Sequence, residues 1–204
     1  MQREILFILL GYFSGSILFA RLWLRLFHRE DHLQNSKDGN PGTANAFMHG
    51  GFLCGVLTLC GDLLKGYLPV AAYLACEATV EWNGWLSLIL AAPVIGHVFP
   101  VFSHFKGGKG IATTFGVLLG LLPEWRPAAV MAFAFILFSI VVRIRPHRSR
   151  TQAAYLLALL GMLLLGVHPC ITGGFFLISL AVWLRLAFSR EPKESMQVKL
   201  LWMH

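Results

Sequence analysis

The amino-acid sequence predicts an all-α, polytopic membrane protein. Of its 204 residues, 56% are apolar and only 13% are charged, about half the charged share of an ordinary soluble domain. The mean hydropathy is +0.66. A soluble chain of this length leaves much of its surface in water, so its core cannot hold this much apolar surface. We therefore expect lipid to cover the remainder of a single domain, residues 1–204.

Seven apolar segments are candidates for membrane-spanning helices. A helix needs about 20 apolar residues to cross a bilayer, and most of these segments approach that length. In chain order they are Ile5–Phe27, Phe52–Cys76, Gly84–Phe102, Ile111–Leu122, Pro127–Val142, Gln152–Val167 and Cys170–Phe188. The fourth segment is short enough to suggest a half-crossing.

The first segment has some features of a secretory signal peptide, because Arg3 precedes an apolar run and small residues follow at 14–16. The apolar run nevertheless continues through Ile17–Phe19 and stops only at Arg21 and Arg25. We interpret it as an uncleaved first span.

Charges in the connections predict the orientation. The side that follows the first, third, fifth and seventh segments is rich in Lys and Arg, whereas the other side has Glu77 and Glu81 and few basic residues. Cytosolic loops carry the basic excess, which places the N-terminus outside and the C-terminus in the cytosol. The net charge of +7 therefore requires no nucleic-acid partner. The basic residues on the predicted cytosolic side are Arg29, Lys37, Lys106, Lys109, Arg143, Arg145, Arg148, Arg150, Arg190, Lys193 and Lys199.

The four cysteines, Cys54, Cys60, Cys76 and Cys170, lie in apolar runs at no metal-ligand spacing. We expect them to be small core residues, and we expect no metal site.

The segment Lys37–Asn45 is unusually rich in Gly, Asn and other turn-forming residues. A plain turn is one interpretation, although a turn needs only about two or three such residues. The alternative is that consecutive backbone N–H groups form an anion-binding concavity. On that interpretation the phosphate-binding residues are Asp38, Gly39, Asn40, Gly42, Thr43 and Asn45.

A second polar stretch, Phe105–Thr113, joins the third and fourth segments. Its lysines are separated by glycines, which allow the backbone to approach a ligand closely. The helix expected to follow would direct its N-terminal N–H groups toward the same point. A cytosolic anchor is the alternative, but an anchor needs no glycine. The Walker A spacing is absent, which disfavours ATP hydrolysis. The predicted anion ligands are Lys106, Gly107, Gly108, Lys109 and Gly110.

Two further polar positions lie inside predicted spans. Asp62 and Lys65 are three residues apart, which lets them pair on one helix face, and charges within a membrane are costly unless they face the interior. They are either a self-neutralised structural pair or part of a substrate site. His97, a few residues before the lysine–glycine stretch, is either a hydrogen-bonded structural residue or a catalytic one.

Several of these residues form motifs. The longest reads Gly96-His97-x-x-Pro100-Val101-Phe102-x-x-Phe105-Lys106-Gly107-Gly108-Lys109-Gly110-x-Ala112-Thr113. The shorter ones are Gly11 with Gly15-Ser16-Ile17, Gly39-Asn40-x-Gly42 with Asn45, and Asp62-x-x-Lys65-Gly66-x-x-Pro69. In this order they resemble the motifs of the bacterial acyl-phosphate:glycerol-3-phosphate acyltransferases, the PlsY family. The resemblance covers roughly residues 5–120 and is only topological beyond them.

The resemblance implies a bacterial inner-membrane enzyme that moves an acyl chain from acyl phosphate to the 1-hydroxyl of glycerol 3-phosphate. The product would be lysophosphatidic acid, for phospholipid synthesis. Acyl phosphate is already activated, so the protein mainly positions reactants and stabilises charge, without a cofactor. No Ser-His-Asp arrangement indicates a covalent intermediate. Membrane lipid and an enzyme of lipid synthesis are the other expected partners. We expect Lys109 and His97 to be catalytic, and Asp62, Lys65 and Ser16 to join the substrate-binding residues.

The chain departs from the family pattern in the segment around Asp38. The family usually has Gly-Ser-Gly-Asn-x-Gly-Ala-Thr-Asn and then an Arg three residues on, whereas this chain has Asp38 for Ser, Thr43-Ala44 for Ala-Thr and Met48 for Arg. The family's His-x-x-Asn-Ile-x-Arg-Leu stretch is also missing, and Arg185–Arg190 reads differently. A carboxylate and a lost guanidinium both predict weaker binding of glycerol 3-phosphate.

Two other functions follow from these departures. One is a divergent acyltransferase with another hydroxyl or amine acceptor, which Asp38 would suit. The other is a non-catalytic membrane protein that binds phospholipid headgroups or a partner enzyme. A transporter is disfavoured, because the polar residues gather at one face and form no path across the midplane.

Overall fold

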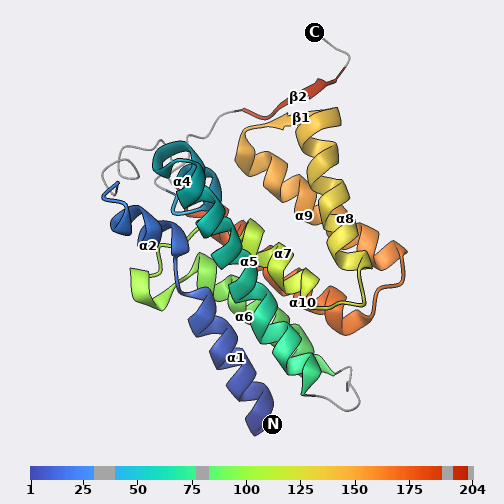
Figure 1. Cartoon of the computed structure of the whole chain (residues 1–204). Coiled ribbons are helices and arrows are strands. Elements are labelled where there is room, and N and C mark those ends of the chain that lie inside the picture. Colours follow the sequence, from blue (N-terminus) through green and yellow to red (C-terminus); the bar gives the residue numbers. More distant parts are fainter. Residues whose placement is uncertain (30–39, 77–82, 190–194, 202–204) are drawn as a thin grey trace.

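The computed structural model describes residues 1–29, 40–76, 83–189 and 195–201 (Figure 1). Within these ranges the chain is helical apart from one pair of short strands, which confirms the predicted all-α membrane class. The elements are α1 (Gln2–Gly15), α2 (Phe19–Leu26), α4 (Thr43–Gly50), α5 (Phe52–Ala75), α6 (Gly84–Val98), a 3₁₀ turn η1 (Val101–Ser103), α7 (Ile111–Leu119), α8 (Arg126–Ile136), a π-helical turn η2 (Leu137–Val141), β1 (Val142–Arg145), α9 (His147–Leu164), α10 (Pro169–Ala187) and β2 (Gln197–Leu200).

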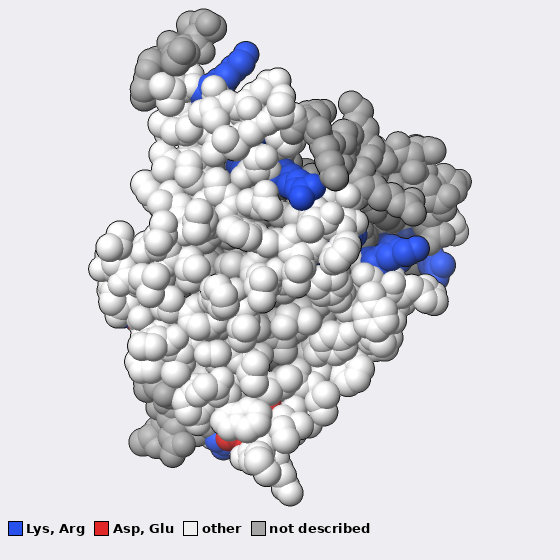
Figure 2. Space-filling model, turned by 180° about the vertical axis from the view of Figure 1, so that it is seen from behind, with Lys and Arg blue, Asp and Glu red and all other residues white. Residues whose placement is uncertain are grey.

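Four helical stretches in the described ranges are long and apolar enough to cross a membrane: Gln2–Leu26, Phe52–Ala75, Gly84–Ser103 and Pro169–Ala187. They correspond to the first, second, third and seventh predicted segments. The count of seven spans and the orientation stay predictions. On the face drawn in Figure 2, most Lys and Arg side chains lie in the upper half, toward the end where Figure 1 places the C-terminus. The acidic side chains of that face lie near its lower end, beside a further basic group.

The first predicted span, Ile5–Phe27, is divided in the structure, because the chain breaks between α1 and α2. Leu18, the residue before α2, has extended backbone angles (φ −91°, ψ 92°), and Figure 1 shows α2 turned away from the axis of α1. The physical reason lies in the composition of α2, which buries only Ala20 and Leu24 and also contains Arg21 and Arg25. Two guanidinium groups are costly in hydrocarbon, and the turn takes α2 off the line of α1.

The fourth predicted segment agrees with its expected form, and the fifth does not. α7 has nine residues, about 14 Å at 1.5 Å per residue, which agrees with the expected half-crossing. α8 gives way to η2 and then to β1, where a continuous helix over Pro127–Val142 was expected. β1 pairs antiparallel with β2, with Val142 opposite Leu200 and Arg145 opposite Gln197. The alternating sequence Val-Arg-Ile-Arg is typical of a strand with one buried face, and Ile144 is buried.

Helix α6 lies at the centre and packs against α1 and α10. Glycine makes the α1–α6 contact possible, because a Cβ at Gly15 would overlap the carbonyl oxygen of Pro93, and a Cβ at Gly96 would overlap that of Tyr12. Small residues of this kind let membrane helices pack backbone to backbone. The junction after α1 is therefore held against α6, close to His97.

Of the four cysteines, only Cys54 is fully buried, while Cys60 and Cys76 are exposed. The expectation that all four are core residues is therefore wrong. Lipid tails are as apolar as the interior of a helical bundle. The apolar character of a residue therefore does not indicate whether it faces the interior or the lipid.

Candidate functional site

The most extensive buried polar cluster in the described ranges surrounds the ammonium group of Lys65. Its Nζ lies 2.8 Å from Asp62 Oδ1, 2.7 Å from His97 Nδ1 and 2.6 Å from the carbonyl oxygen of Ile17. These residues are 5% (Lys65), 1% (Asp62) and 2% (His97) exposed. The predicted pairing of Asp62 with Lys65 is confirmed, and His97 belongs to the same group. We call these three side chains the lysine node.

The lysine node joins three segments of the chain. Ile17 lies at the break between α1 and α2, Asp62 and Lys65 lie on α5, and His97 lies near the end of α6. Ser14 adds a further link, since its hydroxyl donates to the carbonyl oxygen of Lys65. At the helix break, the carbonyl oxygen of Ile17 accepts from Lys65 Nζ. A buried backbone acceptor needs such a donor.

The predicted lysine–glycine stretch lies directly against His97. The Gly108 N–H donates to the His97 carbonyl oxygen at 3.2 Å. A Cβ at Gly107 would overlap that carbonyl oxygen, and a Cβ at Gly108 would overlap His97 Nε2. Only glycine allows the loop to pass so close to the end of α6. Residues 106–110 are called the glycine loop below.

Two arginines outside the predicted set of site residues hold the glycine loop. Arg185 of α10 donates from Nη2 and Nε to the Gly107 carbonyl oxygen, at 2.7 and 3.0 Å. Arg21 of α2 donates to the Lys106 carbonyl oxygen at 3.3 Å. For Arg185 a signal existed, because an arginine within an apolar helix is by default a functional residue. Arg21 gave no such signal beyond marking the end of the first apolar run.

The remaining predicted residues of the loop complete a basic surface. Lys106 is exposed, Lys109 is half-buried, and Gly110 (φ +78°) precedes the first residue of α7. The positive φ is a conformation that favours glycine. The first turn of α7 therefore begins directly after Lys109, and its N–H groups add to the positive potential of the loop.

The structure describes the predicted phosphate-binding segment from Asn40 onward, so Asp38 and Gly39 lie outside the described residues. Gly42 precedes α4, and Thr43 and Asn45 lie in its first turn, where an irregular loop was expected. Asn45 Nδ2 donates to the Asn40 carbonyl oxygen at 2.8 Å. The buried hydroxyl of Thr43 faces the Asp62 carboxylate. The start of α4 thus lies against the lysine node.

Ser16 and Met48 are two further positions that the sequence singled out. Ser16 is completely buried, and its hydroxyl donates to the Tyr12 carbonyl oxygen at 2.8 Å, so its described contact is structural. Met48, which stands where the family has an arginine, is 70% exposed.

Together these contacts define what the site can do chemically. Cationic side chains from α2, the glycine loop and α10 gather around a glycine-rich backbone, next to a helix N-terminus. Such an arrangement suits an anion, and above all a phosphate, because mobile cations and preorganised N–H groups act on the same oxygens. The lysine node lies beneath this surface and supports it through His97.

Comparisons with known proteins give a consistent result. A family model described as glycerol-3-phosphate acyltransferase matches residues 5–194, well past residue 120, where only topological similarity was expected. The glycerol-3-phosphate acyltransferase of Halorhodospira halophila is 33% identical over 198 residues, covering 93% of this chain and 96% of the relative. That of Pseudomonas savastanoi pv. phaseolicola is 42% identical over 130 residues, 64% of each chain. The chain spans less than two thirds of this relative and of the three other Pseudomonas proteins with similar alignments, at 62 to 65%.

A solved structure agrees with these matches. The crystal structure of PlsY, an integral membrane glycerol 3-phosphate acyltransferase, in its glycerol 3-phosphate form superposes with a TM-score of 0.75 at 27% identity, covering 90% of this chain and 88% of that one. Its lysophosphatidic acid form gives a TM-score of 0.73 at 26% identity.

Proposed function

Because the chain belongs to the glycerol-3-phosphate acyltransferase family, we propose that it transfers an acyl chain from acyl phosphate to the 1-hydroxyl of glycerol 3-phosphate. The product is lysophosphatidic acid, the entry to phospholipid synthesis. The observation that carries this proposal is the glycine loop, where Lys106, Lys109, Arg21 and Arg185 meet next to the start of α7. Both substrates present a phosphate to such a surface.

The chemistry needs little from the protein beyond position and charge. The acceptor hydroxyl oxygen attacks the acyl carbon, a C–O ester bond forms, the C–O bond to phosphate breaks, and the hydroxyl proton passes to the released phosphate. Negative charge develops on the carbonyl oxygen and on the leaving phosphate. Lys109, which is half-buried at the mouth of α7, is placed to stabilise that charge.

Purified protein supplied with acyl phosphate tests this proposal by phosphate release. We expect Lys109→Ala to lower turnover by at least about a hundredfold, as the loss of one preorganised charge stabiliser does. Lys106→Ala is the matched comparison on the same loop, and we expect a smaller loss because Lys106 is exposed. Unchanged turnover by a correctly inserted Lys109 variant would remove this residue from the mechanism.

The acceptor is tested in the same assay. Met48 is exposed and stands where the family has an arginine, so this part of α4 lacks the family's guanidinium. That favours a high KM for glycerol 3-phosphate or a different acceptor. A panel of glycerol 3-phosphate, glycerol and amino alcohols separates these outcomes. Phosphate release with none of them would favour a non-catalytic lipid-binding role.

We propose the bacterial inner membrane as the location, with the N-terminus outside and the C-terminus in the cytosol. The distribution of basic loops supports this orientation. Single cysteines at positions 148 and 81, in a background without the native cysteines, test it by labelling from outside intact cells. We expect labelling at position 81 alone, whereas labelling at position 148 would reverse the orientation.

A further inference from the structure

The contacts of Lys65 in the lysine node bear on which nitrogen of His97 carries hydrogen. Lys65 Nζ contacts three groups: a carboxylate, a carbonyl oxygen and an imidazole nitrogen. The carbonyl oxygen of Ile17 only accepts. An ammonium group has three N–H donors and no lone pair. If Lys65 is charged, each contact takes one proton, and Nδ1 of His97 accepts.

Two other distributions that keep the cluster neutral overall also leave hydrogen on Nε2. If the proton sits on Asp62, its hydroxyl donates to the Lys65 amine, which then donates to Ile17 and to His97 Nδ1. If the proton sits on His97, both ring nitrogens carry hydrogen. A bare Nε2 requires a neutral Lys65 amine that accepts from His97 Nδ1, and the cluster is then neutral only if Asp62 is protonated on its other carboxyl oxygen, which leaves Oδ1 to accept from Lys65. The NMR measurement below separates this arrangement from the ion pair of Lys65 with Asp62, in which Nδ1 accepts.

The Nε2 atom of His97 faces the glycine loop. A Cβ at Gly108 would overlap Nε2, so this atom lies against the loop backbone, while Nδ1 points to Lys65. Among the described residues Nε2 has no hydrogen-bond acceptor. With Lys65 charged, the ring has one nitrogen held by the node and an N–H directed at the place where the proposed function puts a phosphate.

We propose that Lys65 holds His97 in the form that carries a proton on Nε2, and that this N–H donates a hydrogen bond to a phosphate oxygen bound at the glycine loop. The proposal rests on the proposed function for the identity of the anion. His97 is then a substrate-binding residue, and Lys65 is a positioning residue that acts through it. The tautomer itself is a property of the unliganded protein and is measured without any turnover.

Nitrogen NMR of the purified full chain with ¹⁵N-labelled histidine measures this tautomer. The chain has eight histidines, and the His97 signals are those absent from His97→Gln. We expect an unprotonated Nδ1 and a protonated Nε2, and we expect added inorganic phosphate to shift the Nε2 signal. A protonated Nδ1 with a bare Nε2 would overturn the tautomer assignment. An Nε2 signal that does not respond to phosphate would overturn the donor role.

Two substitutions at His97 separate the nitrogens. The amide nitrogen of His97→Gln replaces Nε2, and that of His97→Asn replaces Nδ1. We expect KM for the phosphate-bearing substrate to be about tenfold higher in the Asn variant than in the Gln variant, the effect of one hydrogen bond to a charged group. Equal KM values in two folded variants would contradict the proposal.

A paired substitution tests the positioning role of Lys65. Asp62→Leu with Lys65→Met removes both charges together and leaves His97 without its donor. We expect the double variant to fold, to show both tautomers of His97, and to have a raised KM with little change in kcat. A wild-type KM and a single tautomer would show that Lys65 is only structural. An inactive natural protein with the expected Nε2 signal would instead refute the proposed function and leave the tautomer assignment intact.

Discussion

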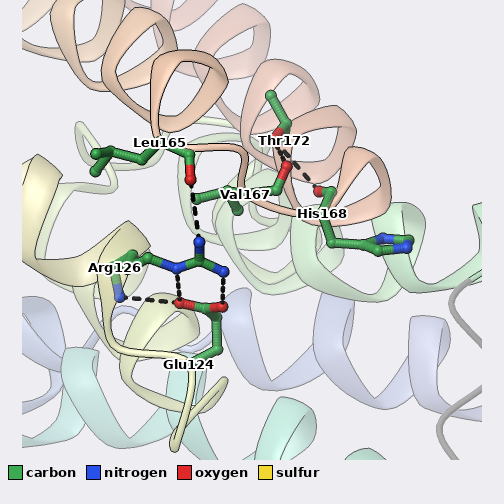
Figure 3. A network of polar contacts seen from close by, with 6 residues as sticks. All are labelled: Glu124, Arg126, Leu165, Val167, His168 and Thr172. Carbon is green, nitrogen blue, oxygen red and sulfur yellow. Dashed lines mark hydrogen bonds and ion pairs between the residues drawn. The ribbon is translucent and has the colours of Figure 1, made fainter.

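Two ion pairs near opposite ends of α10 differ in how far their side chains are exposed to solvent. At the end near Arg185 lies the lysine node, whose charged side chains are almost completely buried. At the other end, Glu124 accepts from Arg126 Nε at 2.8 Å and from its Nη2 (Figure 3). These two side chains are 22% and 38% exposed. α10 has 19 residues, so about 28 Å separates its ends.

The exposed pair connects neighbouring loops and little else. Arg126 Nη1 also donates to the Leu165 carbonyl oxygen at 3.0 Å, which ties the α7–α8 connection to the α9–α10 turn. Thr172 bonds to the backbone of Val167 and His168 close by (Figure 3). Water and salt screen such a pair. The lysine node, by contrast, is almost completely buried, so solvent screens its charges far less, and we expect its stability effects to be far larger.

The largest expected effect comes from breaking the lysine node one charge at a time. Lys65→Met leaves the Asp62 carboxylate buried without its cation, and Asp62→Leu leaves the ammonium without its anion. We expect each change to lower the free energy of unfolding by about 3–5 kcal/mol, measured by denaturant titration of the purified protein in detergent.

The double variant is the control for this prediction. Asp62→Leu with Lys65→Met leaves no uncompensated charge, and a buried ion pair is often replaced by apolar residues at little cost. We expect it to recover most of the stability lost by either single variant. Equal losses in single and double variants would show that shape, and not charge, is what the node contributes.

A smaller effect, on activity, is expected when the loop above the node is moved. The added methyl group of Gly107→Ala would overlap the His97 carbonyl oxygen and displace the loop from the node. Displacement of a binding group by about 1 Å can cost on the order of a hundredfold in rate. We expect a loss of that size in phosphate release. Gly84→Ala is the matched control, because a Cβ there meets nothing within 4 Å, and it should keep full activity.

An equal loss in both glycine variants would point to a general loss of folding. Size-exclusion profiles of the two proteins in detergent separate these outcomes. Full activity in Gly107→Ala would mean that the loop tolerates displacement, and the close approach to His97 would then have no functional role.

Local patterns predicted the parts of this structure that depend on residues close in sequence. Asp62 and Lys65 lie one helical turn apart, and the glycine loop adjoins the helix that follows it, so both were predictable from spacing. The apolar stretches Phe52–Cys76 and Cys170–Phe188 likewise gave nearly the bounds of α5 and α10. The ligand roles of Asp38 and Gly39 stay predictions, since both lie outside the described residues.

Contacts between distant segments were not predictable in this way. His97 and Ile17 lie 32 and 48 residues from Lys65, and Arg185 lies 78 residues from Gly107. No local period indicates which backbone carbonyl a distant guanidinium will reach. The break after α1 was also not predicted, because the apolar composition continues across it. The structure shows why the break is tolerated: the carbonyl oxygen of Ile17 accepts a hydrogen bond from Lys65.

The smallest expected effect comes from the exposed pair. Glu124→Gln removes the carboxylate while Arg126 keeps its bond to Leu165. We expect the melting temperature at neutral pH to fall by at most about 2 °C, because a screened surface pair contributes little. Hydrogen bonding from Arg126 holds the pKa of Glu124 below its ordinary value of 4.5. A carboxyl whose pKa is lowered by folding stabilises the protein above its unfolded pKa and loses that contribution as pH falls through the folded value. The melting temperatures of the natural protein and the variant should therefore differ at neutral pH and converge well below pH 4.5. A difference that persists in acid, or one as large as that of Lys65→Met, would remove the distinction between the two ends of α10.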